Sequence, residues 1–333
     1  MTGIMYLQAF HNDSLQKVVD YTVRTQKETV ADRYLPNDNT YSTEVVFDLV
    51  KKVPLIASMI GYGAEPPVVD RDAIAQIRAE LPKLGIKHII TESELLALAN
   101  TQGHKGLVEG ITSDGKRLTE AILNLVYVMK MQALSMGKYT TRVGGVSAEV
   151  DFQIPEENKI TLEKASDWAT DPNRDVLNDI AEWVERYNDL TFTYPEEILV
   201  SRKIADLLCK HPSVVGQSEK KGVSRISLKK LNEVFADLQL PPLTVIENTK
   251  ITVHNSYTGK EDEITVFPEN RLVLVSKGIG NFLFGPTVEG EGKPGIVLRA
   301  YDKQEPIQSV LKAVATGFPV LEGVNKLMHV DVM

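Results

Sequence analysis

The sequence holds little of what covalent or membrane chemistry requires. Its 333 residues include one cysteine, Cys209, which excludes an intramolecular disulfide framework and a zinc site made of several cysteines. We expect Cys209 to be a small buried hydrophobic residue. No run of about 18 to 20 apolar residues is present, so no membrane-spanning helix is expected. Residues 1–26 are too polar and acidic for a signal peptide, which predicts a soluble protein that stays in the cytoplasm.

Motifs for catalysis and nucleotide binding are incomplete. Residues 137–140 (Gly-Lys-Tyr-Thr) are similar to the end of a phosphate-binding loop, but Gln132 stands where the first glycine belongs and Tyr139 where a magnesium-binding hydroxyl belongs. Residues 278–280 (Gly-Ile-Gly) could begin a dinucleotide fingerprint, yet Leu283 occupies the third glycine position, which favours a tight turn. The histidines lack metal-ligand spacing and no nucleophile elbow is present. The sequence predicts no catalytic residue, no cofactor and no metal site.

Charge and composition limit the remaining classes. A net charge of −8 argues against tight, unspecific DNA binding, which needs clustered lysine and arginine. An ordinary acidic soluble protein is equally compatible with this charge. The length and the 43% hydrophobic content predict a globular chain of about two domains.

The most informative segment is a long amphipathic helix within residues 114–140. Apolar residues recur there at steps of three and four, which places them on one stripe of a helix. Gly137 suits the left-handed residue that ends a helix. At about 1.5 Å per residue the helix would span roughly 30 Å. Such a helix can support separate lobes of a protein.

Other segments have simpler patterns. Residues 54–91 are rich in glycine, proline and both charges, which predicts an extended loop. Residues 148–154 alternate with period two, which is typical of a half-buried strand. Between about 166 and 296 the pattern is mixed α/β. Expected helix N-caps are Asp171 (with Pro172 next), Ser201 and Ser227, and expected strands are 198–200, 243–246, 249–253, 263–266 and 271–275, with a hairpin turn at 255–260.

The order of these features resembles the major capsid protein E family of tailed bacteriophages, the lambda-type head protein. The likeness runs from about Pro54 to the C-terminus, and residues 1–53 match only as an extended, variable arm. The matching features are the charged segment, the long helix with its stop at 137–140, the strand at 150–151, the Glu-Glu-Asn-Lys-Ile-Thr run at 156–161, Trp168, residues 267–274 and residues 310–332.

This resemblance implies a fold and a function. The fold would be α+β, the Hong Kong 97-like shell fold of tailed-phage capsids. Its parts would be an N-terminal arm (1–53), an extended loop (54–91), a peripheral domain with the long spine helix (92–165 and 297–333) and an axial α/β domain (166–296). The chain would assemble into pentamers and hexamers of an icosahedral head shell, which encloses DNA without sequence-specific binding.

The resemblance also implies where copies meet. The extended loop would lie over a neighbouring subunit, where alternating charges can pair and set orientation. Scaffolding and portal proteins, and a decoration protein, are the expected partners, with no membrane involved. The location would be the virion capsid, assembled in the host cytoplasm. Candidate contact residues are Tyr62, Arg71, Asp72, Arg78, Glu80, Lys83 and Lys87.

Three alternatives stay open at this point. The loop could simply be solvated and make no contact between copies. The chain could be a cytoplasmic α/β enzyme with a site near residues 277–285, although acids, bases and metal ligands in a catalytic arrangement are missing. It could also be the shell protein of a bacterial nanocompartment, which shares the fold but encloses cargo enzymes.

Overall fold

The computed structural model describes residues 4–50, 73–141, 148–163, 167–217, 224–254 and 259–333. The chain forms two compact units, each built from segments far apart in the sequence. Unit 1 contains Met1–Val46, Arg78–Lys130 and Asn281–Val320. Unit 2 contains Phe47–Ile77, Met131–Gly280 and Leu321–Met333.

A five-stranded sheet organises unit 1. Its strands run in the order β1 (Asn37–Asn39), β13 (Gly280–Gly285), β15 (Ile307–Leu321) and β14 (Val297–Gln304), and β4 (Lys83–Thr91) also pairs with β15. Both β14 and β4 are antiparallel to β15, whereas β1 is parallel to β13. Because side chains alternate along a strand, one face of this sheet carries a row of buried side chains: Ile90, Leu298, Leu311 and Ala313.

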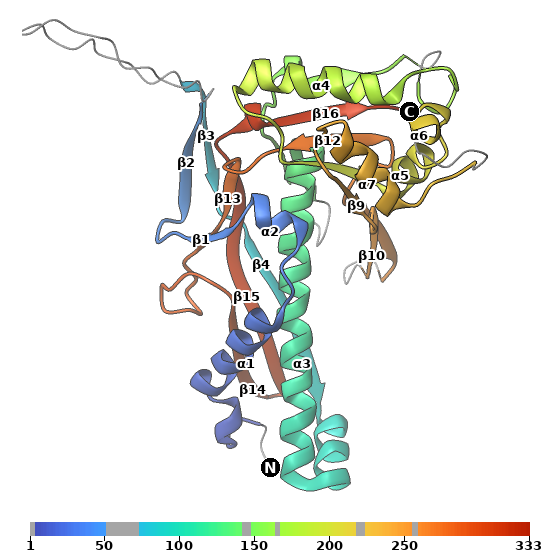
Figure 1. The fold of residues 1–333 in the computed structure, drawn as a ribbon. Coiled ribbons are helices and arrows are strands. Elements are labelled where there is room, and N and C mark those ends of the chain that lie inside the picture. The colour runs from blue at the N-terminus through green and yellow to red at the C-terminus, as the bar shows by residue number, and fades with distance from the viewer. Residues whose placement is uncertain (1–3, 51–72, 142–147, 164–166, 218–223, 255–258) are drawn as a thin grey trace, which may run out of the picture. The chain divides into compact units, whose positions relative to one another are not determined.

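Helices cover that buried face (Figure 1). The long helix α3 (Glu92–Met136) comes close enough at Gly115 that a Cβ atom there would lie 2.9 Å from Leu298 Cδ2. Helix α1 (Asn12–Thr25) adds Leu15 and Val19, both buried. A glycine on α3 therefore allows the helix to sit directly on the sheet.

The predicted long helix is confirmed, but it begins earlier than expected, at Glu92. The preceding segment contains Gly103, Gly106 and Gly110, which are weak helix formers and hide the helix in the sequence. Its end at Met136 is as predicted, and Gly137 has the left-handed φ of +65°.

The N-terminal segment is built into the core of unit 1. It contains η1 (Gln8–Phe10) and α2 (Val30–Tyr34), and β1 joins the sheet. The backbone N–H groups of Ile4 and Met5 donate to the Asp302 carboxylate at 3.0 Å each, and Ile4 and Phe10 are fully buried. The four-part division into arm, loop, peripheral and axial domains remains a prediction.

A buried lysine pairs with a partly buried aspartate of this segment. The Lys130 side chain is 0% exposed, and its Nζ donates to Asp32 Oδ1 at 2.5 Å. The same ammonium group lies 5.6 Å from the centroid of the Phe282 ring. Asp32 also closes a capping box with Thr29 at the start of α2. Burial alone would raise the pKa of Asp32, but hydrogen bonds from Lys130 and Thr29 hold that pKa below its ordinary value.

Unit 2 is a second α/β layer structure. Its sheet runs in the order β7 (Lys159–Thr161), β16 (Leu327–Asp331), β12 (Arg271–Val275), β8 (Glu197–Ser201) and β9 (Leu243–Ile246). Strands β8 and β9 are parallel, and β12 is antiparallel to both β8 and β16. The helices that pack on this sheet share its core: α4 (Val176–Thr191), α5 (Arg202–Leu208), α6 (Pro212–Gln217) and α7 (Leu228–Asp237).

Short elements complete the fold. Three pairs of strands form small ladders: β2 (Glu44–Val50) with β3 (Ala73–Glu80), β5 (Lys138–Thr141) with β6 (Ala148–Asp151), and β10 (Lys250–His254) with β11 (Glu261–Thr265). Two short 3-10 helices, η3 (Glu156–Asn158) and η4 (Val324–Lys326), precede β7 and β16. Residues 255–258 of the predicted hairpin turn lie outside the described residues.

Most expected elements of the mixed segment are confirmed. The side chains of Ser201 and Ser227 cap α5 and α7, and two strands have the predicted bounds. The predicted cap at Asp171 is wrong. Asp171 instead accepts a hydrogen bond from the Asn173 N–H in a turn. Asp175 caps α4 by accepting from the backbone N–H groups of Leu177 and Asn178. Strand β6 ends at Asp151 because Gln153 has a φ of +54°.

The C-terminal carbonyls of α3 are satisfied inside unit 2. His329 Nε2 lies 2.8 Å from Leu134 O, and Arg271 Nη1 donates to Ser135 O at 3.1 Å. Arg271 also forms a two-pronged ion pair with Asp331. Helix ends that are buried need such partners, so β12 and β16 fix the point at which α3 stops.

Replacing Gly137 by alanine is expected to destabilise unit 2 by on the order of 2 kcal/mol, because the left-handed backbone is strained for alanine. Its Cβ would also clash with Ile154 Cδ1. Urea unfolding followed by tryptophan fluorescence measures this, since Trp168 and Trp183 both lie in unit 2. Gly216→Ala in α6 is the matched control, because nothing lies within 4 Å of its Cβ position. Equal stability of the two variants would show that neither the left-handed backbone nor the packing at residue 137 requires glycine.

Candidate inter-subunit surface

The structure describes some of the predicted contact residues and not others. Tyr62, Arg71 and Asp72 lie outside the described residues. Arg78 is in β3, and only its backbone is described. Glu80, the last residue of β3, has an exposed side chain, and Lys83 and Lys87 are exposed on β4. The structure therefore gives side-chain geometry for the end of the candidate segment only.

Strand β4 brings its lysines into a row with cations from the C-terminal part of the chain. Lys87 lies directly opposite Lys312 on β15, and Lys312 lies opposite Arg299 on β14. Directly opposite residues of antiparallel strands point to the same face of a sheet. By the same alternation Lys83 and Lys303 point to this face. We define the basic face as Lys83, Lys87, Arg299, Lys303 and Lys312.

Glu289, in the segment between β13 and β14, is the main counter-ion of the basic face. Its carboxylate accepts hydrogen bonds from Lys312 Nζ and Lys83 Nζ, each at 2.8 Å. These two bonds lower the pKa of Glu289 to about 2. Arg299 Nε donates to the Glu289 backbone oxygen at 2.9 Å, and Arg299 also lies 3.8 Å from Glu291. Lys83 is thus already paired with a carboxylate of its own chain.

The remaining cations are less compensated. Within the part of the chain that the structure describes, neither Lys87 nor Lys303 has a carboxylate within ion-pair distance. Sequence reasoning found Lys83 and Lys87 but missed Arg299, Lys303 and Lys312. Alternation could have placed Arg299 and Lys303 on one face, but only strand register adds Lys312 and brings all three beside β4.

An apolar row borders the basic face. Ile89 lies opposite Val310, which lies opposite Tyr301, on the same face of the same three strands. Val310 is buried, whereas Ile89 and Tyr301 are 37% and 40% exposed. The surface therefore combines positive charge with accessible apolar and aromatic area.

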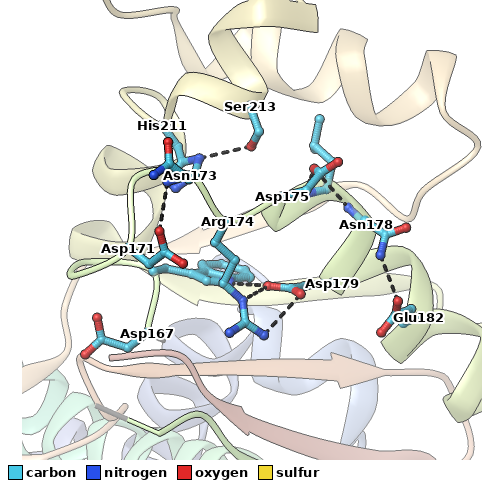
Figure 2. A network of polar contacts seen from close by, with 12 residues as sticks. Asp167, Asp171, Asn173, Arg174, Asp175, Asn178, Asp179, Glu182, His211 and Ser213 are labelled. Atoms are coloured by element: carbon cyan, nitrogen blue, oxygen red, sulfur yellow. Dashed lines mark hydrogen bonds and ion pairs between the residues drawn. The ribbon is translucent and has the colours of Figure 1, made fainter. Parts of the chain in front are cut away.

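A second polar cluster, at the start of α4, has an internal structural role. In Figure 2 the side chain of Arg174 points to Asp179, which accepts hydrogen bonds from its guanidinium. Asp179 also accepts from Trp168 Nε1 at 2.8 Å. Asp175 accepts from the backbone N–H groups of Leu177 and Asn178. These carboxylates are satisfied by N–H donors of unit 2, so they order the segment that leads into α4.

Histidine and cysteine side chains in unit 2 are also structural. His211 Nδ1 lies 3.0 Å from Ser213 Oγ, and burial lowers the pKa of His211 (Figure 2). Cys209 is buried, as predicted, and burial raises the pKa of its thiol. Among the residues that the structure describes, no group of three or more histidine, cysteine, aspartate or glutamate side chains could hold a metal ion.

The two glycine motifs do not have the structures that nucleotide binding requires. Gly137 ends helix α3 and Lys138 begins strand β5, whereas a phosphate-binding loop leads from a strand into a helix. Gly278 has a φ of +78°, and strand β13 follows it instead of a helix. Bends at Lys277 and Ile279 connect β12 to β13, and the tight turn expected at 278–280 remains a prediction. In the described ranges no helix is both long and apolar enough to cross a membrane.

Comparison with known proteins identifies relatives of the chain. Residues 14–295 match the family model of phage major capsid protein E. The match includes most of the segment expected to be a variable arm, and it ends before the resemblance expected at 310–332. None of the curated proteins matches the chain.

Solved structures share the fold at low sequence identity. A prophage capsid protein structure from E. coli CFT073 has a TM-score of 0.64 at 15% identity, covering 97% of this chain and 99% of that one. A phage-related protein from Bordetella bronchiseptica RB50 has a TM-score of 0.61 at 11% identity, covering 97% and 98%. A virus-like particle from Pyrococcus furiosus has a TM-score of 0.50 at 10% identity, covering 98% and 100%. The expected α+β shell fold is confirmed.

Proposed function

The chain belongs to the phage major capsid protein E family, and we propose on that basis that charged residues on and before β4 join its copies in the shell. It is a major capsid protein, and it has the fold of phage capsid shells. The family match over residues 14–295 carries this conclusion. It favours the capsid over the enzyme and the nanocompartment, because neither alternative accounts for a match to a capsid family along most of the chain.

Family membership also supports the finer parts of the proposal. Copies form pentamers and hexamers that close an icosahedral head around DNA, without reading its sequence. Scaffolding and portal proteins, and a decoration protein, act with the chain during assembly in the host cytoplasm. The chain carries out no catalysis. The net charge of −8 supports enclosure of DNA without tight binding, because phosphate binding needs an excess of cations.

The contacts between copies are made by the segment that leads into β4 and by β4 itself. The contact residues are Tyr62, Arg71, Asp72, Arg78, Glu80, Lys83 and Lys87. Support comes from the described end of this segment, where Glu80 and Lys87 are exposed and the basic face begins. Contacts of this heterologous kind close into rings when the rotation between copies permits.

The double variant Arg71→Glu/Arg78→Glu is expected to form few or no shells and to accumulate as small oligomers. Reversing both charges puts like charges together at every repeated boundary. Exposed charges contribute about 1 kcal/mol or less to the fold of one copy, so circular dichroism and melting should stay near wild type. Negative-stain microscopy and size-exclusion chromatography measure the outcome.

Lys203→Glu/Lys229→Glu is the matched control, with the same change of charge on exposed positions of α5 and α7. Shells of normal yield and size from Arg71→Glu/Arg78→Glu would show that these two arginines carry no contact. Loss of shells in the control as well would point to net charge instead of the loop.

A further inference from the structure

The basic face is unfavourable for an isolated copy. Lys87, Lys312 and Arg299 form one row across three neighbouring strands, and like charges directly opposite each other destabilise a sheet. Glu289 offsets Lys83 and Lys312, while Glu291 lies near Arg299. Lys87 and Lys303 keep exposed charge that this arrangement leaves largely uncompensated. A surface of this kind is stabilised when an outside partner supplies negative charge.

We infer that the basic face of β4, β15 and β14 binds carboxylates on an acidic surface of a second copy of this chain. The inference rests on the capsid function and adds the partner and the chemistry of one contact. It extends the candidate surface to Arg299, Lys303 and Lys312, which sequence reasoning did not select.

Charge complementarity identifies the partner. The chain has 45 acidic and 37 basic side chains. Since five of the basic side chains are gathered on one face, the remaining surface is on average more acidic than the chain as a whole. A neighbouring copy therefore offers mainly carboxylates to this face, and opposite charges guide encounter and fix orientation between proteins.

The composition of the face favours a protein partner over DNA. Ile89 and Tyr301 form an exposed apolar border beside the cations. Aromatic side chains are enriched where proteins meet, whereas most contacts to DNA phosphates are made by cations and polar groups. DNA is thus the less favoured occupant.

The face is accessible and partly ordered in advance. Helices α1 and α3 cover the opposite side of the same strands within unit 1. Glu289 holds the ammonium groups of Lys83 and Lys312, and its backbone oxygen holds Arg299. Less side-chain freedom is then lost on binding, which improves affinity. Among the described residues, Lys87 and Lys303 have no carboxylate within ion-pair distance, so these two lysines can form new ion pairs.

The first test is the variant Lys87→Glu/Lys303→Glu, assembled from DNA-free protein. We expect at least a tenfold loss of shells by negative-stain particle counts, together with a melting temperature of the unassembled protein that is unchanged or raised. Lys87→Glu would place a carboxylate opposite Lys312, which favours the fold of one copy. If the basic face had a role only within one copy, this variant would therefore assemble normally. Lys203→Glu/Lys229→Glu should assemble normally.

Each outcome of this test decides something different. Normal shells from Lys87→Glu/Lys303→Glu would overturn the inference while leaving the capsid function intact. Normal shells that bind less added DNA than wild-type shells would overturn it in favour of a DNA-facing surface. Wild-type protein that never forms shells would count against the function itself.

The second test identifies the carboxylate. Shells mixed from ¹⁴N and ¹⁵N copies are treated with a carbodiimide, which joins an amine directly to a carboxylate. Peptides that combine both isotopes and contain Lys87 or Lys303 are expected. Reversing the identified carboxylate to lysine should restore assembly of Lys87→Glu/Lys303→Glu. Crosslinks of these lysines only within one copy would overturn the inference.

Discussion

Replacing Asp32 by asparagine is expected to destabilise unit 1 by about 3–5 kcal/mol, because Lys130 would remain as an unpaired charge in the interior. The Lys130 side chain is fully buried and its Nζ donates to Asp32. Burial already lowers the pKa of Lys130, and only Asp32 acts in the opposite direction. The variant also weakens the capping box of α2, because asparagine offers one uncharged acceptor oxygen where Asp32 offers two charged ones. Hydrogen exchange of α2 and of residues 115–130 measures the effect within unit 1.

Two companion variants make this prediction specific. Asp32→Asn/Lys130→Met removes both charges and keeps the volume of the buried chain, so it should recover most of the lost stability. Asp114→Asn removes a surface carboxylate that lies 3.9 Å from Arg117, and it should cost about 1 kcal/mol or less. An effect of Asp32→Asn no larger than that of Asp114→Asn would contradict the importance of the buried pair.

Acidification is expected to destabilise unit 2 by about 3 kcal/mol between pH 6.5 and 4 through His329 alone. Burial and the nearby Arg271 lower the pKa of His329 to about 4, although the hydrogen bond with Leu134 O acts in the opposite direction. In this pH range the unfolded chain binds a proton at His329 and the folded chain does not. Stability therefore falls as the pH drops, and this contribution levels off below about pH 4.

His329→Gln isolates this effect. The glutamine amide can still donate to Leu134 O but does not titrate. Urea unfolding of the unassembled protein, followed by fluorescence of Trp168 and Trp183, gives the stability of unit 2 at each pH. The stability difference between wild type and variant should shrink as the pH falls from 6.5 to 4. A difference that stays constant with pH would show that His329 titrates normally.

The ends of helices were predictable from the sequence where a single residue determines them. Gly137 stops α3, and Ser201 and Ser227 start α5 and α7, because each acts on its own adjacent backbone. The same reasoning gave the wrong N-cap for α4, because two aspartates near its start are both suitable. Asp171 and Asp175 can both cap a helix, and only the folded turn at Asn173 decides between them.

The pairing of distant strands, and the register of each pair, could not be predicted from the sequence. Lys87 and Arg299 are brought together only because β15 pairs with both of their strands. The role of Glu289 depends on the same pairing, since it joins Lys83 of β4 to Lys312 of β15. The first half of α3 was hidden for another reason: Gly103, Gly106 and Gly110 lower its helix propensity.

Electron microscopy of the purified chain tests the central claim most directly. A major capsid protein whose copies join through complementary charge should form closed shells, and their yield should fall as salt screens those charges. Images taken at high protein concentration with the scaffolding partner supplied should therefore contain closed particles at low ionic strength. Only monomers or small oligomers under these conditions would contradict the claim.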